Sequence, residues 1–115
     1  MKHAVEVGHD NHIHARFIGD SSEADANEFR AATLALLDQQ PDTVFDVLVD
    51  MTEAGTSPPA ALKIYAGLMQ NPHLNKIAFI NAAAIPRAFA NMAINFAHKS
   101  EVQFFETVEE AEKWL

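Results

Sequence analysis

The sequence contains no cysteine, which excludes disulfide bridges, thiol catalysis and any zinc or iron–sulfur site that depends on cysteine ligands. It also has no uncharged apolar run of the ~18 residues that a membrane-spanning helix needs. The first ten residues, MKHAVEVGHD, lack the apolar core of a signal peptide. These absences predict a cytoplasmic protein without an integral membrane segment.

Basic residues are scarce as well. Eight Lys and Arg residues face sixteen Asp and Glu residues, which gives a formal net charge of −8. Nucleic-acid binding depends on clustered cations that neutralise phosphates, so this composition argues against a nucleic-acid partner. The chain also lacks a glycine-rich phosphate loop of the Rossmann or P-loop type, and no nucleotide cofactor is expected.

What is present suits a compact fold. Hydrophobic residues make up 49% of the 115 residues, enough for a core without disulfides or metal. No linker, repeat or low-complexity segment interrupts the chain, so residues 1–115 are expected to form one domain.

The hydrophobic periodicity predicts strands that alternate with helices after an initial hairpin. In the second strand, Ile13, Ala15 and Phe17 alternate with His12, His14 and Arg16, as in a half-buried strand. The expected strands span 3–8, 12–18, 44–51, 76–81 and 102–106, and the expected helices span 21–40, 58–70, 84–99 and 107–115. This order predicts a layered α/β domain with a mixed sheet of about five strands, the later ones largely parallel.

The order of elements resembles that of STAS domains, and more closely that of the SpoIIAA-like group, also described as STAS/SEC14-like. The resemblance covers nearly the whole chain as a pattern. It is carried by FDVLVDMTEAG (45–55), KIAFIN (76–81) and the tail VQFFETVEEAEKWL (102–115).

Such a resemblance implies a non-enzymatic regulatory protein. In the best-known STAS mechanism, a Ser or Thr at the start of the helix after the central strand is phosphorylated and controls partner binding. Thr56 and Ser57 fall at that place. The usual Asp-Ser-Ser-Gly type of pattern is replaced here by the run Gly55-Thr56-Ser57-Pro58-Pro59.

The residues themselves also allow a structural interpretation of Ser57. A serine directly before two prolines is well suited to cap a helix, because its hydroxyl accepts a backbone N–H and Pro58 fills the first helical position. Ser57 is therefore expected to act as the N-cap, with a phosphorylation switch at Ser57 or Thr56 as the alternative.

The helices over 58–70 and 84–99 are apolar around much of their circumference, whereas a surface helix normally has a charged face. Three interpretations remain open: the helices meet a partner surface, they enclose an apolar ligand cavity, or their small residues make exposed faces harmless. The residues expected to form the partner or ligand surface are Leu62, Tyr65, Leu68, Met69, Phe89, Met92 and Phe96.

Polar residues follow two of the expected central strands. Asp50 and Thr52 come at the end of one strand and Asn81 at the end of the next, where α/β sheets often bind ligands. Hydrogen bonds within the turns are the alternative explanation.

Histidines 9, 12 and 14 form the only metal-like cluster. No cysteine or carboxylate completes a specific ligand spacing, so no metal site is predicted. No catalytic motif is present, and an enzyme is not predicted.

The sequence therefore predicts a non-enzymatic regulatory module that binds a protein partner or a second copy of itself. A carrier or sensor of a small apolar ligand is the alternative, and a phosphorylation switch is a third hypothesis. No cofactor is expected.

Overall fold

The computed structural model describes all residues, 1–115. Its strands are β1 (Ala4–Val7), β2 (Ile13–Gly19), β3 (Phe45–Ala54), β4 (Leu74–Ile80) and β5 (Val102–Phe105). Its helices are α1 (Glu23–Gln39), α2 (Pro59–Met69), α3 (Ala84–Ala97) and α4 (Val108–Trp114). The mixed α/β fold, with an antiparallel N-terminal hairpin and five strands, confirms the predicted fold class.

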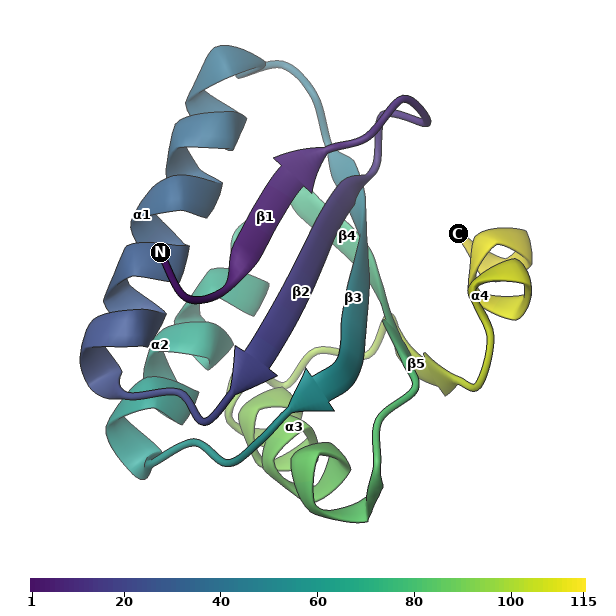
Figure 1. The fold of residues 1–115 in the computed structure, drawn as a ribbon. Coiled ribbons are helices and arrows are strands. Elements are labelled where there is room, and N and C mark those ends of the chain that lie inside the picture. The colour runs from purple at the N-terminus through teal and green to yellow at the C-terminus, as the bar shows by residue number, and fades with distance from the viewer.

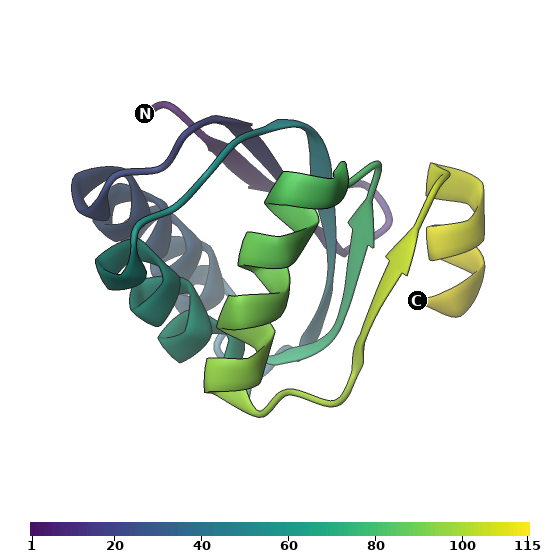
Figure 2. The same cartoon turned by 90° about the horizontal axis from the view of Figure 1, so that it is seen from below.

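The strands lie in the sheet in their chain order, β1-β2-β3-β4-β5. β1 and β2 are antiparallel, and each later pair is parallel. Connections between parallel strands are right-handed. Because each new strand is added at the same edge of the sheet, the helices in these connections all lie on the same face. Accordingly, α1, α2 and α3 cover one face, and α4 lies against the other face at the β4–β5 end (Figures 1 and 2).

Local sequence explains where the helices begin and end. Ser22 caps α1: its hydroxyl accepts the Asp25 N–H at 3.0 Å, and the Asp25 carboxylate accepts the Ser22 N–H at 2.9 Å. Thr107 caps α4 by accepting the Glu110 N–H, and the Glu110 carboxylate accepts from the Thr107 hydroxyl. His98 ends α3 in the left-handed conformation, with φ 53°.

Two apolar layers stabilise the sheet. The larger one lies between the sheet and helices α1–α3, and the smaller one contains Leu48, Ala78, Ile80 and Ala111 beneath α4. Strand periodicity gives the inward faces correctly, since Ile13 and Ala15 are buried and Phe17 is half-buried. None of the four helices has the length and hydrophobicity needed to cross a membrane.

The strand expected over 44–51 is longer than predicted. β3 continues through Thr52, Glu53 and Ala54, although these residues are polar or small. It does so because β2 continues beside it: after an irregularity near Phe17, Ile18 pairs with Glu53 and Gly19 pairs with Ala54. The extra ladder satisfies backbone groups that the hydrophobic pattern alone does not reveal.

Candidate functional site

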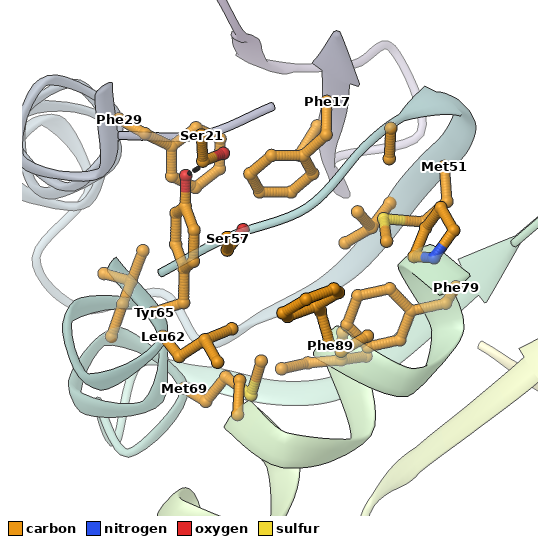
Figure 3. Close-up of a pocket in the computed structure, with 18 of the residues that line it drawn as sticks. Phe17, Ser21, Phe29, Met51, Ser57, Leu62, Tyr65, Met69, Phe79 and Phe89 are labelled. Carbon is orange, nitrogen blue, oxygen red and sulfur yellow. Dashed lines mark hydrogen bonds between the residues drawn. The ribbon is translucent and has the colours of Figure 1, made fainter. Parts of the chain in front are cut away.

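An apolar cavity of about 100 Å³ lies between the sheet and the helical layer. Of its 24 lining residues, 18 are hydrophobic. β2 and β3 contribute Phe17 and Met51, α2 contributes Leu62 and Met69, and α3 contributes Phe89, all shown in Figure 3. One end of the cavity is formed by the segments that follow β2 and β3, at the carboxyl ends of parallel strands, where α/β folds commonly place ligands.

These two segments are joined side by side. The Gly55 N–H donates to Gly19 O at 2.9 Å, and the Ser21 N–H donates to Thr56 O at 2.8 Å. Asp20 Oδ1 accepts the Thr56 N–H at 2.8 Å and the Thr56 hydroxyl at 3.0 Å. These bonds stabilise the ionised carboxylate, which lowers the pKa of Asp20.

The expectation that Ser57 caps α2 is wrong. The N-cap is Pro58, and no side-chain hydrogen bond caps this helix. The Pro-Pro pair moves the start of the helix one residue further than expected, since the residue before a proline is held in an extended conformation. Ser57 instead lines the cavity, is half-buried and makes no side-chain hydrogen bond (Figure 3).

Sequence reasoning missed a buried polar group beside the cavity. His3 is 2% exposed, and its Nε2 lies 2.7 Å from the Ser21 hydroxyl. The Ser21 hydroxyl also accepts the Tyr65 hydroxyl at 2.9 Å (Figure 3). The Ile18 N–H donates to His3 Nδ1 at 3.0 Å. Nδ1 is therefore the acceptor, and Nε2 carries the proton and donates to Ser21.

This tautomer decides what the group can do. A histidine activates a serine by accepting its proton, and here the ring donates to the serine instead. Burial lowers the pKa of His3, which keeps the ring neutral, and burial raises the pKa of Tyr65. The three side chains join the N-terminal strand, the start of α1 and helix α2. An available signal was that His3 alternates with Val5 and Val7, whose side chains pack against the core.

The structure divides the seven residues expected to form one surface. Leu62, Tyr65 and Leu68 of α2 are buried, so their assignment to an exposed partner surface is wrong. Their helix is covered on two sides, because α2 lies between α1 and α3 as well as on the sheet. All three residues line the cavity, together with the half-buried Met69 and Phe89.

By contrast, α3 exposes large apolar side chains. Met92 is 47% exposed and Phe96 is 51% exposed, and Ile85, which was not among the expected residues, is 63% exposed. Their spacing of seven and four residues places them on one side of the helix. We call Ile85, Met92 and Phe96 the α3 stripe. The cavity and the α3 stripe are thus two separate candidate sites. Around the circumference of α3, Phe89 lies between the fully buried side of the helix and the α3 stripe.

A family model described as SpoIIAA-like matches residues 12–115. The chain belongs to the SpoIIAA-like family. A SpoIIAA-like fold is consistent with a regulatory protein-interaction module.

Two solved structures resemble the fold closely. A Shewanella loihica PV-4 protein with a SpoIIAA-like fold is 20% identical, with a TM-score of 0.71 over 98% of this chain and 91% of that chain. The anti-sigma factor antagonist SpoIIAA in its unphosphorylated form is 15% identical, with a TM-score of 0.66 over 96% of this chain and 94% of that one. At these identities the likeness shows the fold alone. No curated protein sequence matches the chain.

The expectation that Asp50 and Thr52 end a strand is wrong, because both lie within β3, and only Asn81 directly follows its strand. All three residues make local contacts. Asp50 Oδ1 accepts the N–H of Thr52 at 2.9 Å and its hydroxyl at 2.6 Å. Asn81 turns the chain after β4 in the left-handed conformation, and its N–H donates to Phe105 O at 3.1 Å. Asp50 and Asn81 share no hydrogen bond, although β3 and β4 are neighbours.

The histidines of the N-terminal hairpin form no common cluster. His14 Nε2 lies 2.9 Å from Asp10 Oδ2, whereas the backbone of His12 donates to the same carboxylate. His9 lies exposed in the turn. No group of three His, Cys, Asp or Glu side chains in the structure is arranged to hold a metal ion.

Proposed function

We propose that this SpoIIAA-like protein is a regulatory protein-interaction module that binds its partner through the α3 stripe. The observation that carries the proposal is the exposure of three large apolar side chains on one side of one helix. Their clustering distinguishes them from the isolated apolar residues found on most surfaces.

Energetics favour the same surface. Burying a large apolar side chain against a partner contributes roughly 1.5–3 kcal/mol. Clusters of such residues commonly supply most of the binding energy of an interface. The other exposed apolar residues form no comparable row on one helix: Val44, for example, precedes β3, and Val108 lies on α4.

Quantitative partner capture tests the proposal. The wild type and the variant Met92→Glu/Phe96→Glu would be used to isolate binding proteins from cells that express the chain naturally. We expect the double variant to lose the specifically retained proteins. Val108→Glu is the matched control, because Val108 is 37% exposed and lies on α4, on the other face of the sheet from α3 (Figure 1). Equal retention by all three proteins would reject the α3 stripe as the binding surface.

A second copy of the chain is one partner that this surface could take. In that case a homodimer should appear in the native mass spectrum of the wild type, and the double variant should be monomeric. A wild-type monomer would leave only a different protein as the partner.

The cavity supports a second candidate function, that of a carrier or sensor of a small apolar ligand. Its lining is mostly apolar, and the unpartnered Ser57 hydroxyl could bind one polar group of a ligand. Pockets for drug-sized ligands enclose roughly 300–1,000 Å³. The cavity of about 100 Å³ is smaller, so a single ring fits it better than a fatty acyl chain.

Ligand binding predicts a rise in thermal stability by mass action. Indole and lauric acid would be titrated against the wild type and against Ala90→Leu, which fills part of the cavity. Indole should stabilise only the wild type. The absence of any response, together with a native mass at the bare chain value, would reject the carrier function.

A phosphorylation switch at Ser57 or Thr56 is the third candidate. The Ser57 hydroxyl has no hydrogen-bond partner to lose, whereas Thr56 is bonded to Asp20. A phosphoryl group on Thr56 would lie beside that carboxylate and would be repelled by it. Ser57 is therefore the better candidate. Ser57→Asp should weaken partner binding much more than it changes stability, and equal effects on both would reject the switch.

A further inference from the structure

The buried group of His3, Ser21 and Tyr65 holds more hydrogen-bond protons than hydrogen bonds. His3 Nε2 and the hydroxyls of Ser21 and Tyr65 each carry one proton. Only two bonds join these atoms, one from Nε2 to Ser21 Oγ at 2.7 Å and one between the two hydroxyls at 2.9 Å. One hydroxyl proton is therefore left without an acceptor, and we call it the unmatched proton.

This result holds for either direction of the bond between the hydroxyls. Because the Ile18 N–H donates to His3 Nδ1, the ring donates to Ser21 in both cases. If the Tyr65 hydroxyl donates to Ser21, the Ser21 proton is left over. If Ser21 donates to Tyr65, the Tyr65 proton is left over. Ser21 is 6% exposed and Tyr65 is 8% exposed, and leaving a buried donor unpaired costs stability.

The unmatched proton lies at the wall of the apolar cavity. Ser21 and Tyr65 both line the cavity, so either hydroxyl can meet a molecule inside it (Figure 3). Thr33 lines the cavity too, but its hydroxyl already donates to Phe29 O at 2.9 Å. The cavity therefore offers a hydrogen-bond donor at one place in a mostly apolar wall.

The rest of the wall limits the kind of molecule that fits. No charged side chain lines the cavity, so nothing would offset the cost of burying an ionised ligand. Aromatic rings form much of the lining, and rings pack well against other rings at their edges and faces. The volume of about 100 Å³ limits the ligand to one small ring. The aromatic lining residues are Phe17, Phe29, Tyr65, Phe79 and Phe89.

We propose that the cavity binds a neutral, single-ring aromatic compound with one hydrogen-bond acceptor, such as a carbonyl oxygen, which receives the unmatched proton of Ser21 or Tyr65. The aromatic lining covers the ring, and the acceptor completes the buried polar group. This inference rests on the second candidate function, the carrier or sensor of a small apolar ligand, and adds the chemistry of the ligand.

Three probes of nearly the same shape test the inference. Acetophenone has a carbonyl acceptor, α-methylstyrene has a methylene group in place of the carbonyl oxygen, and benzoate is ionised at neutral pH. Their dissociation constants would be measured from chemical-shift changes in NMR spectra of the labelled protein. Acetophenone and α-methylstyrene should bind, and benzoate should bind far more weakly. Because α-methylstyrene is the more hydrophobic probe, the hydrogen bond is measured by comparing the ratio of the two dissociation constants between protein variants.

Either hydroxyl can supply the proton, so only the removal of both should abolish its effect. In Ser21→Ala/Tyr65→Phe the preference for acetophenone over α-methylstyrene should fall about tenfold, a typical effect of one hydrogen bond to a buried neutral group. Tyr65→Phe alone should keep most of the preference, because the Ser21 proton remains free. Ser57→Ala is the matched control, since it removes another hydroxyl of the lining outside this group and should leave the preference unchanged.

A second measurement needs no variant. In the wild type, nuclear Overhauser effects should connect the acetophenone methyl group to ring protons of Tyr65. Binding of acetophenone without these effects would place it elsewhere and overturn the inference, even if the double variant does not fold.

The other outcomes separate the inference from the carrier function. An equal preference in the wild type and the double variant would mean that only water meets the unmatched proton. Loss of the preference in Ser57→Ala would assign the donor to Ser57. Benzoate binding as tight as that of acetophenone would contradict a neutral ligand. Each of these results overturns the inference and leaves the carrier function standing, whereas the failure of all three probes and of indole to bind would reject both.

Discussion

Helices α2 and α3 have similar apolar compositions and different surroundings. α2 is the middle helix of its layer, so α1, α3 and the sheet cover Leu62, Tyr65 and Leu68. α3 is the last helix of the same layer, and the sheet and α2 cover only part of it. Its row at Ile85, Met92 and Phe96 stays exposed. Hydropathy shows that a helix lacks a polar face, but the position of the helix in its layer decides whether that face is covered.

The largest expected effect comes from placing a carboxylate on α2 and, for comparison, on α3. Leu68→Glu places a carboxylate in the core and should cost at least roughly 4 kcal/mol of unfolding free energy, a large part of the stability of a small domain. Met92→Glu should leave the protein folded, because Met92 is already half in water. Urea denaturation followed by circular dichroism measures both. Similar losses in the two variants would contradict the different burial of α2 and α3.

A second comparison uses two glycines. At Gly55 a Cβ atom would collide with Asp20 Oδ1 and lie 2.9 Å from both Asp20 N and Gly19 C. Gly55→Ala should therefore destabilise the protein by about 2 kcal/mol. Gly67 of α2 has nothing within 4 Å of that position, so Gly67→Ala should stabilise it by about 0.5–1 kcal/mol. Thermal unfolding curves distinguish the expected loss of stability from the expected gain. A Gly55→Ala variant as stable as the wild type would show that the segments after β2 and β3 can shift to make room for the methyl group.

The group that links β1 to α2 predicts a pH dependence. Because burial lowers the pKa of His3 in the folded protein, the unfolded chain binds a proton first as the pH falls below the ordinary value of 6.5. The contribution of neutral His3 to the unfolding free energy is therefore complete above that pH and declines as the pH falls below it. The wild type should therefore lose stability between about pH 7 and about pH 5. His3→Gln should lose less over the same range, and parallel curves would show that His3 does not control this dependence.

The smallest expected effect compares two serines. Ser22 caps α1, and Ser22→Ala should cost about 1 kcal/mol. Ser57 caps nothing, so Ser57→Ala should change the unfolding free energy by less than about 0.5 kcal/mol. Chemical denaturation of the two variants side by side tests this difference. An equal cost would restore the capping role of Ser57.

Local patterns predicted the elements well, because strand and helix periods depend on nearby residues. Ile13, Ala15 and Phe17 lie on the inner face as their alternation indicates, and the helix expected over 21–40 spans Glu23–Gln39 with Ser22 as its N-cap. The start of α2 differed because two consecutive prolines act together: Pro59 holds Pro58 in an extended conformation, so Pro58 is the N-cap and the helix begins at Pro59.

The candidate site depended on contacts that no local pattern contains. His3 and Tyr65 meet at Ser21 across three elements, and Gly55 lies against Gly19 from a neighbouring strand. The separation of Leu68 from Met92 follows from the order of helices in the layer.

The most direct test of the α3 stripe is methionine oxidation by dilute hydrogen peroxide, followed by peptide mass spectrometry. Met92 is 47% exposed and Met1 is 60% exposed, whereas Met51 is buried and Met69 is half-buried. In the free protein, Met1 and Met92 should oxidise fastest and Met51 slowest. With a captured partner bound, Met92 should become protected while Met1 does not. If Met92 is protected before any partner is added, or stays reactive after one has bound, α3 is not the binding surface.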